Sequence, residues 1–458
     1  MVMVILGVCG MAIDLGFMYN RRVELQNMAD AAALAAAGEL DGTGPGITRA
    51  MTSATAVANT FKYRYTQNVT WSDAAIKFGS DPAGTGDWVA GDLARSTPAT
   101  RLFARVDTLA LDESMGMVRT LFMNVLSASK DAVMQGHATA GRMGIKVAPL
   151  AICALSPTRA AGRATDAGAE LVEFGFRRGI SYDLMRLNPN GTTPENFVVN
   201  PFAPPGTPGT SGATSSSIVG PYICTGTMAM PRVMGGNLTV RRPFPLASLV
   251  DQLNSRFDKF ETNACSRFSA PPDANIKAYL YGEINWMSPK PLGQSAASTD
   301  AGGKLLTVAD ISPAPSTNTA GMYGPLWVYA KAVPFSAYTA GTPEPSAGYT
   351  GFASGAWANL YKPGQPAASG YPSTTPYLVN SGDNFGAPST TIRPQRNRRV
   401  LNVVLLACPV AAGTTVAAAP LGVGKFFMTV PATDTALYAE FAGVAEEAAL
   451  ATSTGLFP

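Results

Sequence analysis

The chain has 458 residues, a formal net charge of +3 and 14% charged residues. Its length is enough for more than one domain of ~100 to 200 residues. Soluble domains average roughly 25% charged residues. The lower share here, with 46 glycines and 35 prolines, indicates a loop-rich exterior built on strands. The small net charge, without a basic run that also carries aromatic residues, argues against nucleic acid as a partner.

The first forty residues are the most distinctive part of the chain. Residues 1–13 are apolar or glycine without a break, and the first acid is Asp14. The next charges are Arg21 and Arg22, and no proline interrupts the segment. Strong helix formers dominate its second half, which includes an alanine-rich run. We therefore predict one continuous helix over residues 1–40.

Such a helix would be about 58 Å long, far more than the roughly 30 Å of a hydrocarbon core. We expect residues 1–19 to lie in a membrane or a filament core and the remainder to pack outside it. Two other interpretations are weaker. A signal peptide would begin with basic residues and end at a nearby cleavage site. A buried helix of a soluble protein can also be apolar over ten to fourteen residues.

Three motifs follow one another within residues 11–35. The first is Met-Ala-Ile-Asp-Leu-Gly from Met11, the second is the aromatic and basic group from Tyr19 to Arg22, and the third is Gln-Asn-Met-Ala-Asp-Ala-Ala-Ala-Leu-Ala from Gln26. In order and spacing this segment resembles the amino-terminal signature of TadE/TadG-like proteins of the bacterial Tad (Flp) pilus system. Relatives usually carry a longer apolar segment after a basic leader, so we expect a processed or shortened start here.

The resemblance implies a type IV pilin-like subunit. Its helix would sit in the bacterial inner membrane before assembly and in a filament or at the filament base afterwards, with the globular part outside. The implied partners are copies of the same chain, which form a helical homopolymer, together with the inner membrane and other Tad pilus components. The expected location is the inner membrane first, then a cell-surface filament or a periplasm-facing anchor.

Asp14 is the first candidate assembly residue. A carboxylate in an apolar setting costs at least ~2.5 kcal/mol, so it needs a partner. Arg21 and Arg22 lie two turns away on the same helix, whereas helix neighbours are three or four residues apart. We therefore expect an adjacent copy to bring its arginine or its amino terminus to Asp14.

Small residues are the second candidate feature for assembly. Gly16, Ala32 and Ala36 keep the helix surface smooth, and small residues let apolar helices approach closely. We expect these positions to pack against neighbouring copies, so that Leu at Ala32 and Ala36 would block filaments and spare the soluble fold. The alternative is that the alanines pack on the β domain of their own chain.

Cysteine placement predicts two disulfides outside the membrane. Cys9 lies in the apolar helix and should stay reduced, which leaves four cysteines with three possible pairings. Cys153 and Cys408 each end a run of strand-forming residues, and neighbouring strands with cysteines at matching ends favour their pairing. Cys224 would then pair with Cys265.

The expected fold class is α+β: a long amino-terminal helix followed by a mainly β ectodomain with long loops of Gly, Pro, Ser and Thr. We expect four parts, namely the helix 1–40, a pilin-like α+β domain 41–155, an inserted loop-rich β region 156–398, and strands 399–458 that complete the sheet.

Apolar periodicity places the individual elements. The helix over 245–260 is the clearest of them, because its leucines and phenylalanines share one face. Further helices are expected at 47–63 and 117–126. Strands are expected at 75–78, 101–106, 131–140, 145–152, 276–281, 326–333, 400–408, 425–430 and 437–441. The arginines from Arg393 to Arg399 predict a solvated loop before one of these strands.

No catalytic or metal residue is assigned. His137 is the sole histidine, which excludes a histidine-rich metal site and leaves little for a Ser-His or Cys-His nucleophile. The segment from Asp112 to Gly116 lacks the final serine of a D-x-S-x-S metal motif and predicts a loop that caps a short helix. We expect no cofactor and no enzymatic activity. The leading hypothesis is a structural pilus subunit, and the alternative is a monomeric membrane-anchored adhesin or a pilus-assembly factor at the pilus base.

Overall fold

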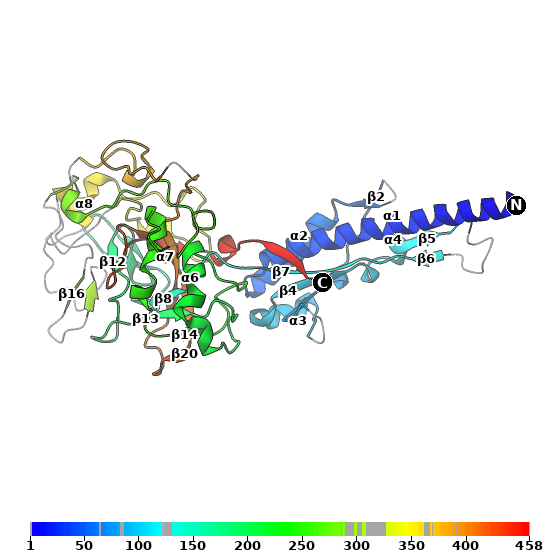
Figure 1. The fold of residues 1–458 in the computed structure, drawn as a ribbon, viewed down its shortest axis with the longest axis horizontal. Helices are drawn as coiled ribbons and strands as arrows, with labels where there is room; N and C mark the ends of the chain where they lie inside the picture. The colour runs from blue at the N-terminus through cyan, green and yellow to red at the C-terminus, as the bar shows by residue number, and fades with distance from the viewer. Residues whose placement is uncertain are drawn as a thin grey trace. The chain divides into compact units, whose positions relative to one another are not determined.

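The computed structural model describes residues 2–457 except 64–65, 83–86, 121, 123–130, 263, 285, 289–296, 300–304, 308–326, 361–366, 369 and 390–392. The chain forms two compact units (Figure 1). Unit 1 comprises Met1–Ile145, Met230–Gly235 and Ala451–Pro458, and unit 2 comprises Lys146–Ala229 and Gly236–Leu450. The boundary expected after residue 155 thus lies at Ile145, because the strand that follows joins the sheet of unit 2.

Unit 1 is organised on one long helix, α1 (Val2–Glu39), as the uninterrupted run of helix formers predicts. A second helix, α2 (Gly44–Ala58), packs against it and is shorter than the expected 47–63. Thr43 caps α2, since its side-chain oxygen accepts a hydrogen bond from the backbone N–H of Gly46 at 3.0 Å. Beyond Ala58 the chain turns into strand β1 (Lys62–Tyr63).

A four-stranded antiparallel sheet covers the second half of α1. Its order is β23 (Thr454–Phe457), β7 (His137–Arg142), β4 (Phe103–Asp107) and β3 (Ile76–Gly79). Small side chains from α1 and α2 and the apolar face of the sheet form one buried cluster. The remaining elements of unit 1 are β2 (Gln67–Asn68), η1 (Asp73–Ala75), α3 (Gly91–Ser96), η2 (Pro98–Thr100), η3 (Thr108–Ala110), α4 (Glu113–Gly116), β5 (Met117–Arg119) and β6 (Asp131–Val133).

Two expectations for unit 1 are corrected. The helix expected at 117–126 begins as strand β5, which pairs with β6, and residues 121 and 123–126 lie outside the described part. The strand expected at 131–140 divides into β6 and β7. The division falls near Gly136, where a side chain would meet the α1 backbone: a Cβ there would approach the Gln26 nitrogen to 2.6 Å.

Unit 2 is built on an eight-stranded mixed sheet. Strands β19 and β8 are parallel, and all the other neighbours are antiparallel. The carboxyl-terminal strands β19, β21 and β22 lie in the same sheet as β8. The strand order is β12 (Ser181–Asp183), β22 (Tyr438–Ala445), β21 (Pro420–Met428), β19 (Val400–Leu406), β8 (Leu150–Cys153), β13 (Asn196–Val199), β14 (Leu238–Arg241) and β20 (Thr415–Ala418).

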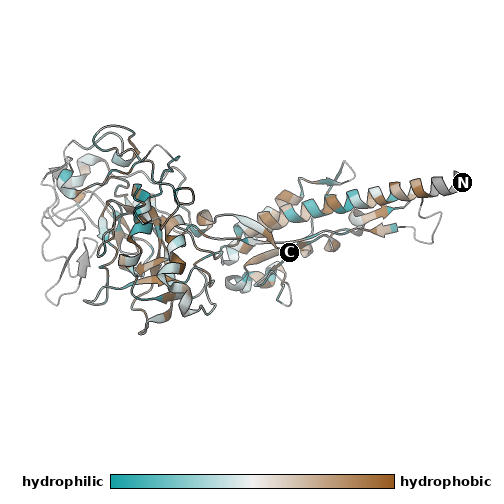
Figure 2. Cartoon of the chain, viewed as in Figure 1, coloured by the Kyte–Doolittle hydropathy of each residue, from teal (hydrophilic) through white to brown (hydrophobic). Residues whose placement is uncertain are grey.

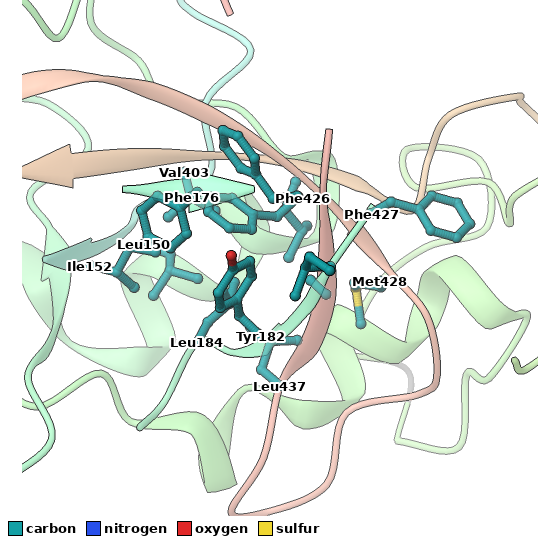
Figure 3. Packing of buried hydrophobic residues seen from close by; sticks show 14 of the residues in the cluster. Leu150, Ile152, Phe176, Tyr182, Leu184, Val403, Phe426, Phe427, Met428 and Leu437 are labelled. Atoms are coloured by element: carbon teal, nitrogen blue, oxygen red, sulfur yellow. The ribbon is translucent and has the colours of Figure 1, made fainter. Parts of the chain in front are cut away.

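Aromatic and aliphatic side chains from this sheet and from the segments packed on it form the core of unit 2 (Figure 3). The rings of Phe176 and Phe426 lie edge to face with their centroids 5.3 Å apart, and Tyr182 packs against Phe176 at 5.1 Å. A fully buried phenylalanine contributes about 1.5 to 3 kcal/mol, so such a cluster supplies much of the driving force for folding.

Short elements surround the sheet of unit 2. A three-stranded sheet is formed by β9 (Ala161–Arg163), β10 (Glu170–Glu173) and β11 (Phe176–Arg177), and two further strand pairs are β15 (Met287–Ser288) with β18 (Ala367–Ala368) and β16 (Ala297–Thr299) with β17 (Leu305–Thr307). The helices are α6 (Ser216–Thr225), α7 (Val250–Asn254) and α8 (Trp357–Leu360). The 3-10 turns are η4 (Ser211–Thr214), η5 (Leu246–Ser248), η6 (Ser255–Phe257), η7 (Tyr281–Glu283), η8 (Phe335–Ala337), η9 (Ser354–Ala356), η10 (Pro376–Leu378) and η11 (Glu447–Leu450).

The helix expected at 245–260 is divided into η5, α7 and η6. Its apolar face is buried as predicted. Within this stretch the Asn254 side chain donates to the Ala432 carbonyl at 2.9 Å and accepts from the Ala432 N–H at 2.7 Å. Asp258 then adopts a positive φ of 61°, which ends the segment.

The strands expected at 276–281 and 326–333 are not strands in the described part of the chain. Remote side chains supply part of their backbone hydrogen bonding. Glu440 accepts from three successive N–H groups that begin at Val328, and the Arg399 guanidinium donates to carbonyls that include Lys277 at 2.9 Å. Isolated backbone bonds, such as the one from the Tyr279 N–H to the Thr429 carbonyl at 2.9 Å, supply another part.

Candidate functional site: the first half of the long helix

The first half of α1 extends past β4 and β7 (Figure 1). Strand β5 lies against it in this region. The next charges in sequence after Asp14 come only at Arg21, so this part of the helix meets its surroundings mainly through apolar groups. Its side chains are described from Val8 onward.

Large apolar side chains are exposed on this half of α1. Their exposed fractions run from 42% to 72%, and the residues are Val8, Met11, Ile13, Leu15, Phe17 and Tyr19. Because successive helical positions are about 100° apart, these residues point to several sides of the helix. Figure 2 shows brown to white colour along this part. No helix is long and apolar enough to cross a bilayer among the residues that the structure describes.

One strip of this half is covered by the chain itself. We call β5, β6 and Phe122 the arm. The backbone N–H of Phe122 donates to the Asp14 carboxylate at 2.8 Å, and Asp14 is fully buried. The Phe122 ring lies over Gly10 so closely that a Cβ at Gly10 would meet it at 2.4 Å. The partner of Asp14, which we expected from a neighbouring copy, is therefore supplied by the same chain.

Arg21 and Arg22 differ in their surroundings. The Arg21 guanidinium donates to Glu24 at 2.7 Å and lies 5.3 Å from the centre of the Tyr63 ring. Arg22 is exposed. A cavity of 510 Å³ lies beside Arg21, between α1 on one side and α4 and β5 on the other. Its lining residues are Phe17, Asn20, Arg21, Glu24, Ser114, Met117, Val118 and Arg119.

The small residues proposed for assembly do not share one surface. Ala32 and Ala36 are fully buried in the cluster formed by α1, α2 and the four-stranded sheet. This corrects the expectation that they face a neighbouring copy: their small size is required by close packing within unit 1. Gly16 is exposed, with open space where a Cβ would be.

The comparison with known proteins bears on this same helix. Residues 1–39 match the family model described as Flp pilus-assembly TadE/G-like. The amino-terminal segment is TadE/G-like. The match ends at Glu39, which is also the last residue of α1, so the family pattern and the helix coincide. No curated protein and no solved structure matches the chain.

Outside the TadE/G-like segment, the two predicted disulfides are confirmed. Cys153 pairs with Cys408 and Cys224 pairs with Cys265, with Cα–Cα distances of 5.6 and 5.7 Å. The fifth cysteine, Cys9, is a free and exposed thiol within the TadE/G-like segment. Glu195 lies near the first disulfide. The sulfurs there are bonded to each other, so they are not available as thiolate ligands.

Other titratable groups outside this segment act within the fold. Asp112 caps α4, because its carboxylate accepts from the Ser114 N–H at 2.8 Å. Glu344 accepts from Arg178 at 2.7 Å and from Lys425 at 3.0 Å. Burial acts to raise the pKa of Glu344, but these two cations outweigh it and lower that pKa.

Glu440 lies fully buried under the segment that follows residue 326. It accepts from the backbone N–H groups of Val328, Tyr329 and Ala330 at 3.1, 3.1 and 2.6 Å. Burial raises the pKa of Glu440 to about 7, against the opposing effect of these donors and of Arg399. The sequence carried no signal for this arrangement, because the partners of Glu440 are backbone groups more than a hundred residues away.

Proposed function

We propose that this chain is a non-enzymatic structural subunit of a Tad/Flp-type surface filament, held in place by the exposed half of α1. It would sit in the bacterial inner membrane before assembly. In the filament, its partners would be the helices of other copies and further Tad pilus components. The observation that carries the proposal is the coincidence of the TadE/G-like match with a helix whose first half exposes large apolar residues.

Energetics supports an attachment role for these side chains. Moving a Leu, Phe, Met or Val side chain out of water contributes about 1.5 to 3 kcal/mol. The six exposed side chains of α1 retain 42% to 72% of their accessible surface, so together they would contribute on the order of 5 to 10 kcal/mol, which is comparable with the whole folding stability of a domain. A helix that is apolar on several sides is favoured in surroundings without water, such as lipid or a helix bundle.

One observation favours the alternative, a monomeric membrane-anchored adhesin or assembly factor at the pilus base. Asp14 has its hydrogen-bond donor within the chain, and Ala32 and Ala36 pack in the chain's own core. None of the three residues therefore requires a second copy. Under this alternative, the exposed half of α1 would remain in lipid.

The two functions can be separated by comparing helix-face variants on cells. Leu15→Asp places a charge on the exposed half of α1, where Leu15 is 64% exposed. The control Leu93→Asp changes a side chain that is 56% exposed on α3. In sheared surface material, negative-stain microscopy with antibody labelling should find the chain in filaments for the wild type and Leu93→Asp, and not for Leu15→Asp.

The contrary outcome is equally specific. If the purified chain is monomeric in detergent and no filament on wild-type cells contains it, the filament proposal fails and the anchored alternative replaces it. Circular dichroism and retention of both disulfides in each purified variant would show that the fold is intact.

A further inference from the structure

The arm has a position that the attachment role of α1 alone does not explain. Phe122 is 41% exposed although its ring packs on Gly10, and Val133 of β6 is 55% exposed. We propose that the arm enters the lipid bilayer together with α1, with Phe122 among the acyl chains and Arg119 of β5 and Asp131 of β6 at the headgroup level, so that the membrane-contacting element is a composite of helix and arm. This inference rests on the proposed function, in which the first half of α1 enters the inner membrane before assembly.

Phe122 lies at the level of the apolar stretch of α1. Phe122 contacts Gly10 through its ring and Asp14 through its backbone N–H. These two positions are about 6 Å apart along the axis and lie within the stretch from Val8 to Tyr19 that carries the exposed apolar side chains. When this stretch lies in lipid, a residue bonded to its middle lies at the same depth.

The charge on Asp14 ties the arm to the helix. A carboxylate within hydrocarbon needs a donor, and irregular backbone at that depth is tolerated only where its polar groups are paired. The bond from the Phe122 N–H to Asp14 gives the carboxylate a donor and pairs one backbone N–H of the arm. If the arm stayed in water while α1 entered lipid, this donor would be withdrawn from a buried carboxylate. The arm and the helix should therefore enter together.

The directions of the exposed side chains favour lipid, and not a single protein face, as the surroundings of this half of α1. The exposed apolar residues point to several sides of α1, as in a helix surrounded by acyl chains. Tyr19 is 72% exposed and is followed by the exposed Arg22. Lys62, also exposed, adjoins the Tyr63 ring that contacts Arg21, and the exposed Arg119 lines the same cavity as Arg21.

These groups form a border of the kind found at lipid headgroups, where an aromatic ring and basic side chains follow an apolar segment. Acids also lie at this level: Glu24 pairs with Arg21, Asp131 stands opposite Arg119 in the β5–β6 ladder, and Asp112 accepts from the N–H of Ser114, which lines the same cavity. Arg22 and Lys62 are exposed cations of the border, and such groups attract anionic phospholipid.

A site-directed label tests the composite element directly. The full chain carries one free thiol, Cys9, because its other four cysteines form disulfides. Three proteins each carry one nitroxide. The first is the wild type, labelled at Cys9. The other two carry Cys9→Ser together with either Phe122→Cys or Leu93→Cys and are labelled at position 122 or 93. Each protein is reconstituted in vesicles of phosphatidylcholine and phosphatidylglycerol, and relaxation by lipid-soluble oxygen is compared with relaxation by a water-soluble nickel complex.

We expect oxygen to dominate at positions 9 and 122 and the nickel complex to dominate at position 93. A lipid-exposed label at position 9 with a water-exposed label at position 122 would overturn the composite element and leave the attachment role of α1 intact. Water-exposed labels at both positions would overturn the attachment role as well.

A charge-insertion series provides a second readout that needs no label. In flotation with the same vesicles, Phe122→Asp should lower the ratio of bound to free protein by about tenfold or more, because a charge in hydrocarbon is costly. Phe122→Leu, which stays apolar, and Leu93→Asp, on the surface of α3, should bind as the wild type does. Equal binding by Phe122→Asp and the wild type would refute lipid contact at Phe122.

Discussion

At the scale of single residues, Asp14 combines a charge with an apolar segment. Its side chain is fully buried and accepts from the Phe122 N–H at 2.8 Å. A hydrogen bond to a charged group contributes about 1.5 to 3 kcal/mol, and a donor left without its acceptor weakens the contact further. We therefore predict that Asp14→Ala releases Phe122 from α1. Amide hydrogen exchange at Phe122 should become faster in this variant.

Asp14→Asn is the matched control, because its side-chain carbonyl can still accept from the Phe122 N–H. It should retain more protection at Phe122 than Asp14→Ala does. Unchanged exchange at Phe122 in Asp14→Ala would show that the bond does not hold the arm.

A second residue-scale prediction concerns Glu440, whose pKa burial raises to about 7. A glutamate in an unfolded chain titrates near roughly 4.3. Between these two values the folded chain binds more protons than the unfolded chain, so the free energy of unfolding should fall as pH rises through this window. The variant Glu440→Gln does not titrate and should show a weaker fall, measured by urea unfolding below and above the window.

Glu446→Gln is the control for this measurement, because it changes a carboxylate whose side chain is 40% exposed and pairs with Arg159. It should keep the pH dependence of the wild type. If Glu440→Gln and the wild type show the same pH dependence, Glu440 does not titrate in this window.

The partners of buried charged groups could not be predicted from the sequence. The run that ends at Arg399 was expected to be a solvated loop, yet Arg399 is fully buried and its guanidinium donates to the carbonyls of Met428, Thr429, Asn275 and Lys277. Backbone carbonyls leave no mark in a sequence, so no pattern could have identified these partners. Asp14 is similar, since the need for a partner was evident from the sequence and the identity of Phe122 was not.

At the scale of elements, the second half of α1 is limited by the space around its alanines. Ala32 of α1 is fully buried in the cluster that α1 forms with α2 and the four-stranded sheet. Larger side chains in a filled core cost about 1 to 3 kcal/mol. We predict that Ala32→Leu lowers the thermal unfolding temperature of unit 1. The control Ala12→Leu, at an exposed position of the same helix, should leave it nearly unchanged. Equal stability of Ala32→Leu and the wild type would contradict the packing described here.

The two disulfides offer a comparison between loops of different length. Their cysteines are separated by 255 residues for Cys153–Cys408 and by 41 residues for Cys224–Cys265. In the chain-entropy description the stabilisation grows as 1.5RT times the logarithm of loop length, which favours the longer loop by about 1.6 kcal/mol. Replacing the Cys153–Cys408 pair by alanine should therefore destabilise unit 2 more, as measured by urea unfolding. A larger loss for the Cys224–Cys265 pair would contradict this account.

The extent to which elements could be predicted follows from where their hydrogen bonds are made. Helix α1 and strands β4 and β19 were predicted because their own residues carry the periodicity and the propensity. The segment 326–333 has the composition of a strand, but three of its described N–H groups, those of Val328 to Ala330, bond to Glu440 from β22. The helix at 245–260 kept most of its apolar face but is divided into η5, α7 and η6. Contacts with a distant segment thus decided the first of these two cases.

At the scale of the whole molecule, α1 serves two purposes with one continuous helix. Its second half is part of the core of unit 1, whereas its first half exposes apolar residues and is covered along one strip by the arm. A rigid helix of this kind would transmit the position of its first half to the folded unit without a flexible linker. The proposed filament subunit depends on this continuity, because the attachment surface and the fold share α1.

Photocrosslinking from the exposed half of α1 tests the filament proposal most directly. A photoreactive amino acid at Leu15, which is 64% exposed, would be activated on intact cells and its products mapped by mass spectrometry. The account predicts adducts between two copies of this chain, with both crosslinked peptides from residues 2–39 and with the adduct recovered in sheared filaments. Adducts with lipid alone, and no adduct between copies in any fraction, would contradict it.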